Sequence, residues 1–449
     1  MKKIIFIEKT PFMGVELLDM FPSFQIACYY NDNTYSLLKN NGFQIFSYGN
    51  NSFRDNIDSD KAIELLLSDK SFLKKIDANF PGSKVIFFYM NDEMASLCKK
   101  NKLKLALPPY KIQKRVGDKL FTQKINKILK LNENKTLVIQ KSSKKYFDIL
   151  YLKCEKKLGL PFIIQGRDGV SGSDTFLIRS FEEFKKLIDK MSNKFRASRY
   201  IKNLIPISVH LCIKENTVLY DGPFLQIVGF NELSSNPFQF SGNDTNQSLF
   251  DQTLKDNIKE TSLKIANYLH ILKYQGIAGL DFLWDLDTGT IYLQEVNARL
   301  VGLTRLLTGI QIEQNKKPHL LSHIECFTSK SIGMVKKQTT SEKNTHYSQI
   351  YISNSAKKTN HVTRQLSPGI YQLKNNTLFK TKHSLFLKDM NPNSILITFC
   401  VSTQTPLKPD DVAIKLLMKR SVIQPNKYIL TDHAKSIIGI LRSEVGLTV

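Results

Sequence analysis

The chain lacks a long apolar run, a closely spaced pair of cysteines and a glycine-rich fingerprint after its first apolar segment. Because no run reaches about 18 apolar residues, no membrane-spanning helix is expected. Residues 1–8 are charged and then apolar, but that run is too short for a signal peptide and instead predicts a buried first strand. The absence of a G-x-G-x-x-G pattern after this strand argues against a dinucleotide-binding site.

Cysteines are few and scattered. The six are Cys28, Cys98, Cys154, Cys212, Cys326 and Cys400. None belongs to a CxxC pair, so neither a zinc site nor a disulfide framework is expected, and a reducing cytoplasm is the predicted location. His319 and His323, with Cys326 nearby, are interpreted as an incidental i, i+4 histidine pair rather than a metal site.

Acidic residues are fewer than basic ones, with 40 Asp and Glu against 64 Lys and Arg, which gives a formal net charge of +24. Such an excess is compatible with a polyanionic partner. The lysines are nevertheless spread through the chain, and their clusters lack the aromatic interleaving of a base-stacking platform. We interpret them as solvated surface residues and expect neither a nucleic-acid nor a membrane partner.

The first part of the chain alternates short apolar runs with helical patterns. Strand-like runs occur at 4–7, 25–29, 43–46 and 84–89, and helical spacing at 60–67 and 92–100. Strands that alternate with helices predict a small parallel α/β domain. It ends near Pro108-Pro109, which breaks the pattern.

A glycine- and serine-rich loop, residues 166–175, joins two apolar runs and is followed by a helical pattern from Ser180. Glycines at 166, 169 and 172 would let the backbone approach a ligand and turn N–H groups toward it. Ser171 and Ser173 add hydroxyl donors. The alternative is an ordinary hairpin turn.

Later segments are less regular. Gly222, Asn236, Pro237, Gly242 and Asn243 predict an irregular loop before a helix over 251–272. The polar segment 335–345 is interpreted as a linker or exposed loop. Beyond it, strands are predicted at 349–353, 385–387 and 394–401, and helices at 410–419 and 432–442.

The most informative segment is 279–299, which reads as two apolar strands joined by Asp285-Leu286-Asp287-Thr288-Gly289. A reversal near Thr288 pairs Asp281 with Glu295 and places Asn297 on the same face. Two opposed carboxylates repel unless a cation lies between them. Carboxylate and amide oxygens suit Mg²⁺ held with nucleotide phosphates. The alternative is a solvated hairpin face.

These segments, in this order, resemble the ATP-grasp superfamily of ATP-dependent carboxylate ligases over about residues 110–330. The hairpin is similar to the family's acidic residue followed by Glu-x-Asn-x-Arg. The resemblance implies that Asp281, Glu295 and Asn297 bind one or two Mg²⁺ (or Mn²⁺) ions. It also implies that Arg299 meets phosphate or substrate carboxylate, and that Arg299 and Glu295 are the catalytic residues.

The resemblance also implies an ATP site. Lys119, in Gly117-Asp118-Lys119, would reach a nucleotide phosphate, and the loop 166–175 is similar to the flap that closes over the β- and γ-phosphates. The implied ATP-binding residues are Lys119, Gln165, Gly169, Ser171, Gly172, Ser173 and, at an adenine-reading hinge, Tyr200 and Ile201. The chain departs from the family at Gln165, where many members carry a second lysine. Arg167 or Lys119 could supply the missing charge.

The resemblance organises the chain into a pre-ATP-grasp α/β domain (1–107), an α+β ATP-grasp domain (108–334, with a flap-bearing subdomain of about 115–200) and a small α+β accessory domain (346–449). It implies an enzyme that activates a carboxylate as an acyl phosphate and joins it to an amine, with an amino acid or short peptide as substrate. The alternatives are a carboxylase that resembles biotin carboxylase and activates bicarbonate, or an inactive nucleotide-binding module. No biotin-carrier lysine motif is present.

Two segments are candidate walls of the substrate pocket: 230–246 and 300–308, the second with Arg305. Packing is the equal alternative for both. The expected partners are small carboxylate and amine substrates and, for the protein itself, a second copy in a homodimer.

Overall fold

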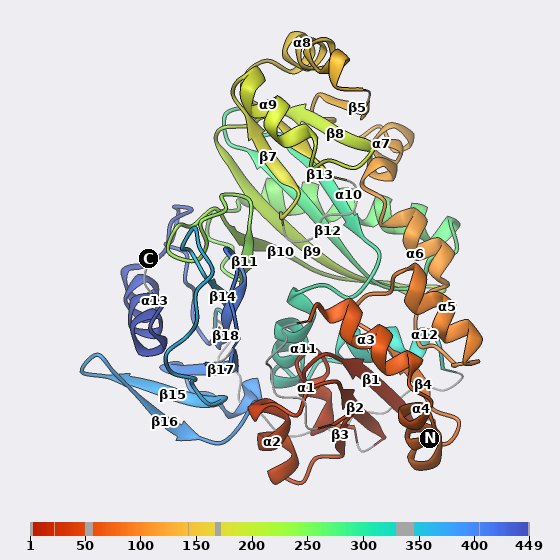
Figure 1. The fold of residues 1–449 in the computed structure, drawn as a ribbon, viewed down its shortest axis with the longest axis vertical. Helices are drawn as coiled ribbons and strands as arrows, with labels where there is room; N and C mark the ends of the chain where they lie inside the picture. The colour runs from red at the N-terminus through yellow and green to blue at the C-terminus, as the bar shows by residue number, and fades with distance from the viewer. Residues whose placement is uncertain are drawn as a thin grey trace.

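The computed structural model describes residues 3–21, 23–49, 57–141, 143–166, 172–328, 345–403 and 405–447. Arg167, Gly169, Ser171 and most of the segment 335–345 lie outside these ranges, so the predictions made for them are not addressed. Within the described ranges, no helix is both long and apolar enough to cross a membrane. The strands form three sheets (Figure 1).

The N-terminal sheet is parallel and has four strands. In spatial order they are β3 (Ile45–Ser47), β2 (Phe24–Cys28), β1 (Ile4–Glu8) and β4 (Lys84–Ile86). Every residue of β1 and β2 is buried, as expected for parallel strands covered on both faces. The predicted α/β domain is confirmed.

The helices of this part are α1 (Val15–Leu18), α2 (Asn33–Asn40), α3 (Ser59–Ser68), α4 (Lys70–Asn79) and α5 (Asp92–Lys100). Three of them have an N-cap residue whose side chain accepts a hydrogen bond from a backbone N–H of the first turn. These residues are Asp32, Asp69 and Asn91. Two further helices, α6 (Tyr110–Val116) and α7 (Lys119–Ile128), lead away from the domain.

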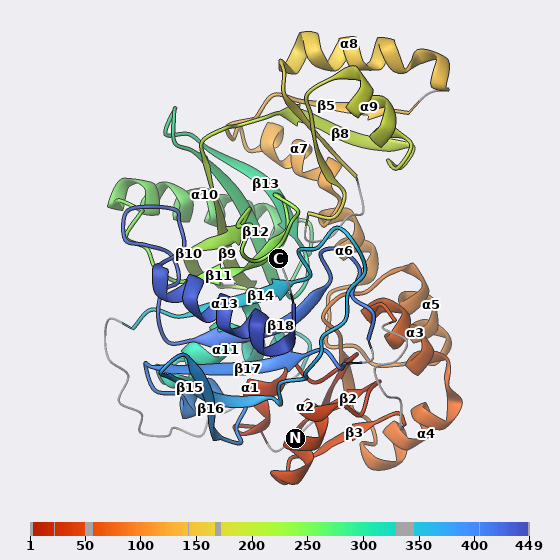
Figure 2. The same cartoon turned by 60° about the vertical axis from the view of Figure 1, so that its left-hand side comes forward.

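The second sheet forms a separate lobe at one end of the molecule in both views (Figures 1 and 2). Its strands are, in spatial order, β5 (Thr136–Gln140), β8 (Lys194–Arg199), β6 (Phe162–Gln165) and β7 (Thr175–Ile178). Helices α8 (Phe147–Leu158) and α9 (Phe181–Ile188) pack on it. The predicted hairpin around the loop 166–175 is confirmed by the antiparallel pairing of β6 and β7.

The third sheet has ten strands and carries the rest of the chain. In spatial order they are β13 (Ile291–Asn297), β12 (Gly276–Asp285), β9 (Leu204–Ile213), β10 (Val218–Val228), β11 (Phe240–Asp244), β14 (Ser348–Ser353), β18 (Val412–Met418), β17 (Ser394–Cys400), β15 (Gly369–Lys374) and β16 (Thr377–Lys382). The sheet is continuous across the expected boundary between the central and C-terminal domains.

Both faces of the central part of this sheet are covered, whereas β16 at its end is exposed. In β9, Leu211 and Ile213 pack with α10 (Gln252–Ile271), whereas Cys212 between them faces the core shared with the N-terminal domain. That second core also holds α11 (Leu303–Glu313) and α12 (His319–Cys326). Helix α13 (Asp432–Val445) packs with the C-terminal strands. The predicted helices 251–272 and 432–442 correspond to α10 and α13.

Gly242 makes the junction between β11 and β14. Its φ is +137°, and a Cβ atom there would lie 2.0 Å from the carbonyl oxygen of Gln349. Only glycine allows this approach of two backbones. The sequence interpretation of this segment as irregular loop was therefore wrong for Phe240–Asp244, since a glycine that permits close strand pairing has the same signature as a loop glycine.

Two C-terminal predictions were also wrong. Residues 410–419, predicted as a helix, contain β18, because a strand buried between two neighbours reads as a continuous apolar run. Residues 385–387, predicted as a strand, lead instead into a short 3₁₀ helix, Leu387–Asp389.

Candidate active site

A cavity of about 980 Å³ is lined by the N-terminal domain, the lobe and both halves of the ten-stranded sheet. Its wall includes every described residue of the predicted site except Ser173: Lys119, Gln165, Gly172, Tyr200, Ile201, Asp281, Glu295, Asn297 and Arg299. Residues separated by up to 180 positions in sequence are therefore brought to one enclosure, as the resemblance implied.

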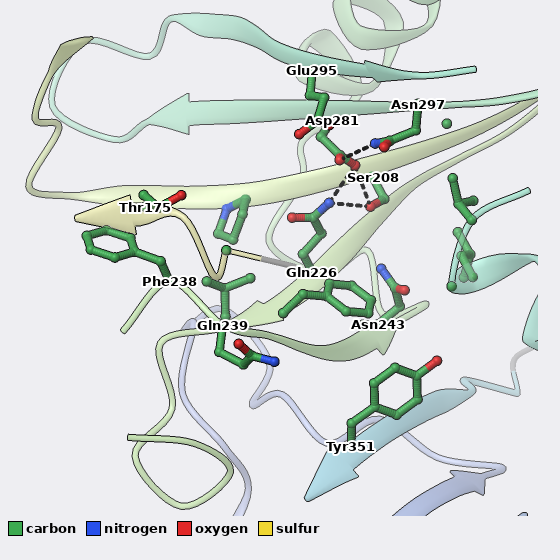
Figure 3. Close-up of a pocket in the computed structure, with 18 of the residues that line it drawn as sticks. Thr175, Ser208, Gln226, Phe238, Gln239, Asn243, Asp281, Glu295, Asn297 and Tyr351 are labelled. Carbon is green, nitrogen blue, oxygen red and sulfur yellow. Dashed lines mark hydrogen bonds between the residues drawn. The ribbon is translucent and has the colours of Figure 1, made fainter. Parts of the chain in front are cut away.

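The hairpin of β12 and β13 has the predicted register. Asp281 pairs with Glu295, Gly279 pairs with Asn297, and the ladder shifts by one residue only beyond Asp281. The turn closes through a hydrogen bond from the Gly289 N–H to the Asp285 carbonyl (2.8 Å). The opposed carboxylates and the neighbouring amide form what we call the acidic end of the cavity: Asp281, Glu295 and Asn297 (Figure 3).

Asp281 is held by three donors. Its Oδ1 accepts from Gln226 Nε2 (2.6 Å) and from Ser208 Oγ (3.2 Å), and its Oδ2 accepts from Asn297 Nδ2 (2.8 Å) (Figure 3). Burial and the facing Glu295 carboxylate nevertheless raise the pKa of Asp281 to about 7. A divalent cation between the two carboxylates would remove this repulsion.

Arg299 is fixed beside the acidic end. Its Nη2 donates to Asn297 Oδ1 (2.8 Å) and its Nη1 donates to the Leu300 carbonyl (3.1 Å). The guanidinium also lies 5.5 Å from the ring centroid of Phe88, a residue that follows β4. Arg299 therefore joins the hairpin to the N-terminal domain while its charge stays at the cavity wall.

Lys119 is the first residue of α7. The helix begins at Asp118, whose side chain accepts from the Leu120 N–H (2.9 Å), and this cap sets where Lys119 lies. Only 5% of Lys119 is exposed. Burial lowers the pKa of Lys119, and the Glu295 carboxylate opposes that change. A buried ammonium in a cavity wall is suited to an anionic ligand.

Gln165 has a charged neighbour that the sequence did not reveal. Its Oε1 accepts from Arg196 Nη2 and from Gln294 Nε2 (3.3 Å). Because both neighbours donate, the amide must turn its oxygen toward them and its NH₂ group away. Arg196 is 5% exposed, and its Nη1 donates to the Gln294 carbonyl (3.1 Å). A buried guanidinium thus lies directly behind Gln165.

The loop 166–175 contacts the segment that follows β10 at Gly172. At Gly172, φ is +84° and a Cβ atom would lie 1.9 Å from the Phe238 carbonyl oxygen. Thr175 and Phe238 flank the same side of the cavity (Figure 3). Gly172 thus permits a close approach to the protein's own backbone, and the approach of this loop to a ligand stays a prediction.

Tyr200 and Ile201 follow β8 and line the cavity at the base of the lobe. Arg199, the last residue of β8, donates through Nε to Asn134 Oδ1 (3.3 Å) and lies 3.6 Å from the Asp285 carboxylate. These bonds tie the lobe to the central hairpin next to the predicted hinge.

Only part of each segment predicted as a pocket wall lines the cavity. Residues 237–240 and Asn243 line the cavity, as do 301–303, whereas Arg305 is fully buried 3.8 Å from Glu16. His319 and His323 lie in hydrogen-bond networks of the core: His319 Nδ1 is 3.1 Å from His210 Nδ1, and His323 Nδ1 accepts from a backbone N–H. For Arg305, the packing alternative is therefore the one that the structure supports.

No protein-family model and no curated protein sequence matches the chain. Solved structures do match. The biotin carboxylase domain of Hydrogenobacter thermophilus 2-oxoglutarate carboxylase, in complex with MgADP, ADP and bicarbonate, has a TM-score of 0.64 at 13% identity, over 94% of this chain and 87% of that one. Staphylococcus aureus N5-carboxyaminoimidazole synthetase, complexed with ADP, has a TM-score of 0.56 at 13% identity, over 99% and 98% of the two chains.

Both kinds of enzyme are carboxylate–amine ligases of the ATP-grasp superfamily. The chain has the ATP-grasp fold. Identities of 13% extend this likeness to the fold and no further. The predicted fold class is confirmed, while the domain limits and the roles of single residues stay predictions.

The oxygen ligands at the acidic end of the cavity fit a hard divalent cation. Among the described residues, no hydrogen bond to the Glu295 carboxylate is found. No group of three or more His, Cys, Asp or Glu residues that could hold a metal ion occurs in that part of the chain, so the acidic end offers two carboxylates and one amide. Three of the four lone-pair positions of Asp281 are used, and the Asn297 oxygen already accepts from Arg299, so the Glu295 carboxylate is the most available ligand.

Sequence reasoning missed the residues that support this candidate site. Gln226 and Ser208 hold Asp281, and Arg196 holds Gln165. Ser208 had a signal, because it is a polar residue in a strand of alternating character. Arg196 had none, because β8 itself was not predicted and its partners lie 31 and 98 positions away.

Proposed function

We propose that this protein is an ATP- and Mg²⁺-dependent ligase that activates a carboxylate as an acyl phosphate and joins it to an amine. The observation that carries the proposal is the acidic end, Asp281 opposite Glu295 beside Asn297, in one cavity with Lys119 and Gln165. Two opposed carboxylates favour a bound cation, and the ammonium of Lys119 at the cavity wall attracts an anion. Mg·ATP supplies both. An amino acid or short peptide is the proposed substrate class.

The proposed roles follow from the geometry. Mg²⁺, or Mn²⁺, held by Asp281, Glu295 and Asn297 would neutralise phosphate charge. Lys119 binds a phosphate oxygen, and the NH₂ group of Gln165 donates to the nucleotide. Arg299, held rigid by two hydrogen bonds, orients the substrate carboxylate for attack on the γ-phosphate.

The remaining parts position the nucleotide and keep water out. The loop that contains Gly172 and Ser173 covers the phosphates, since an acyl phosphate hydrolyses readily in water. Backbone groups of Tyr200 and Ile201 meet the adenine. The reaction places two anions together and stabilises the charge that develops, so it requires no nucleophilic side chain.

Hydroxylamine trapping tests the proposal. The protein is incubated with ATP, MgCl₂, hydroxylamine and a panel of amino acids and short peptides, and hydroxamate and ADP are measured. ATP-dependent hydroxamate from at least one acid is the expected result. ATP binding without hydroxamate from any acid would show that acyl-phosphate chemistry is wrong.

Glu295→Gln is the matched variant. It keeps the shape of the side chain but removes the charge, so hydroxamate formation should fall at least about 10²-fold while the thermal unfolding midpoint stays close to that of the wild type. Glu260→Gln, on the exposed face of α10, is the control and should leave the rate unchanged. Near-normal activity of the Glu295 variant would remove this residue from the metal site.

A bicarbonate-activating carboxylase is the second candidate. Its support is the fold, which matches two enzymes. One is a biotin carboxylase domain whose structure contains bicarbonate, and the other is a carboxyaminoimidazole synthetase. It differs from the first candidate only in the acid. ADP release that depends on bicarbonate, in the absence of any organic acid, would favour it.

A further inference from the structure

A lysine on β18 lies in an aromatic cage at a part of the cavity away from the acidic end. Lys415 pairs with Tyr351 of β14 and with Phe399 of β17, so the three side chains share one face of the sheet. The ammonium nitrogen lies 5.1 Å and 5.8 Å from the centroids of these rings, and 4.5 Å from that of Phe12. All four residues line the cavity.

The cage is separated from the acidic end by polar residues of the wall. Tyr351 lies across the cavity from Asp281, with Gln226 and Asn243 between them (Figure 3). A single elongated molecule could therefore reach both places.

The rings leave the hydrogen-bonding capacity of Lys415 unused. An ammonium group has three N–H donors, and ring faces attract its charge without accepting directional hydrogen bonds. Among the described residues, its Nζ donates no hydrogen bond and forms no ion pair. The carboxylate of Glu8 accepts instead from the backbone N–H groups of Met13 (2.7 Å), Phe12 (3.3 Å) and Gly14 (3.4 Å). Glu8 thus fixes the loop that carries Phe12.

The charges around the cage are of both signs: Lys9 and Arg305 are near, and so are the carboxylates of Glu8, Asp58 and Asp411 on the cavity wall. Burial lowers the pKa of Lys415 to about 8, and the charges of Lys9 and Arg305 add to this effect, while Glu8 opposes it. Arg305 lies 4.7 Å from the Phe12 ring centroid, and its carboxylate partner Glu16 is buried beneath it. A leucine in place of Lys415 would pack on the same rings without this desolvation cost. The lysine is therefore suited to a ligand that compensates the cost.

We propose that Lys415 binds an anionic group, a carboxylate or a phosphate, carried by a substrate in addition to the carboxylate that reacts. Calling the ligand a substrate rests on the proposed function; the anion site does not. The apolar part of the molecule would pack on Phe12, Tyr351 and Phe399. The substrate class is then an acid with a second anionic group at its far end, such as an acidic amino acid or a phosphorylated acid.

Competitive acylation of the full chain with acetic anhydride tests the site. The protein, with MgCl₂ and ADP, is labelled alone and with glutarate, glycerol 3-phosphate or the neutral diester dimethyl glutarate, and lysine labelling is read by peptide mass spectrometry. Labelling of Lys415 should fall about tenfold with one of the two anions and not with the diester. The effective anion tells a carboxylate site from a phosphate site. Exposed Lys435 of α13 is the internal control and should be labelled equally in all samples.

Equal labelling of Lys415 in all samples, or equal protection by the diester, would overturn the inference. Lys415→Arg should keep, and Lys415→Met should lose, the rise in unfolding midpoint that the effective anion produces. Since labelling requires no turnover, the two proposals fail separately. A protected Lys415 without hydroxamate formation refutes only the ligase, and hydroxamate formation with an unprotected Lys415 refutes only the anion site.

Discussion

Asp281 is a single residue whose charged form is destabilised by its position in the site. Its carboxylate is buried opposite Glu295, and three hydrogen bonds only partly offset the loss of water and the repulsion. Such a group is stable when neutral or when a cation is near. The residue-scale consequences therefore concern protons, cations and the donors around them.

The first prediction concerns pH. The pKa of Asp281 is raised to about 7, so the metal-free fold is favoured with this group protonated. Its contribution to stability is present below the ordinary pKa and is lost as pH rises toward about 7. Mg²⁺ requires the carboxylate, so its affinity should increase over the same window.

Thermal unfolding with and without MgCl₂, from about pH 5 to about pH 8, measures this linkage. The stabilisation by Mg²⁺ should grow with pH in the wild type and be nearly flat in Asp281→Asn. The variant is needed as a control because Glu8 and Glu16 also have a pKa of about 7. A magnesium effect that is independent of pH in the wild type would contradict the prediction.

The second prediction concerns Gln165 and Arg196. In Gln165→Glu, the new carboxylate would pair with the buried guanidinium, so the unfolding midpoint should not fall. The same change removes the NH₂ donor and adds a negative charge at the cavity wall. ADP affinity measured by calorimetry should therefore fall at least about tenfold. Unchanged affinity would show that Gln165 does not face the nucleotide.

At the scale of elements, the described part of the loop 166–175 contacts the segment after β10 at a glycine. Gly172 has a left-handed φ of +84° and lies against the Phe238 carbonyl. Gly42 has nearly the same φ, +82°, but no atom lies within 4 Å of its Cβ position. The two glycines share a backbone conformation and differ only in what they touch.

The third prediction compares these two glycines. Gly42→Ala should lower the free energy of unfolding by about 1 kcal/mol, because alanine is strained at positive φ, and Gly172→Ala by at least as much, because its Cβ would also clash with the Phe238 carbonyl. Only Gly172→Ala should prevent the loop from closing, and the ratio of ATP hydrolysed to hydroxamate formed should rise in that variant alone. Equal ratios in both variants would mean that closure does not depend on this contact.

At the scale of the whole molecule, the three hydrophobic cores differ in how far apart in sequence their residues lie. The buried residues of the lobe core all lie between Ile139 and Ala197. The other two cores each combine distant segments: one joins β1 and β2 to α11, α12 and β17, and the other joins β9 and α10 to β14 and α13. The ten-stranded sheet contributes to both, so these parts should unfold together.

The fourth prediction follows for hydrogen exchange. Backbone amides of β6, β7 and α9 should exchange through openings of lower free energy than those of β9, β12 and β14. Mg²⁺ with a non-hydrolysable ATP analogue should slow hydrogen exchange of the amides in the lobe more than that of amides in the ten-stranded sheet. Exchange is measured by mass spectrometry. The same opening free energy for all these elements would contradict the prediction that the lobe opens separately.

The sequence by itself determined the acidic end of the cavity. The register of β12 and β13 follows from a local turn, so Asp281, Glu295 and Asn297 were placed correctly from spacing alone. The helix start at Asp118-Lys119 and the hairpin of β6 and β7 could also be predicted, because each depends on residues close together in sequence.

Only the tertiary structure decided the contacts between distant segments. Strand β18 was mistaken for a helix because its burial depends on neighbours far away in sequence, and Gly242 was mistaken for a loop glycine because its partner is Gln349. Arg196 behind Gln165 and the cage around Lys415 arise in the same way. Hydrophobic periodicity and turn chemistry act over a few residues, whereas these contacts depend on how three sheets come together around one cavity.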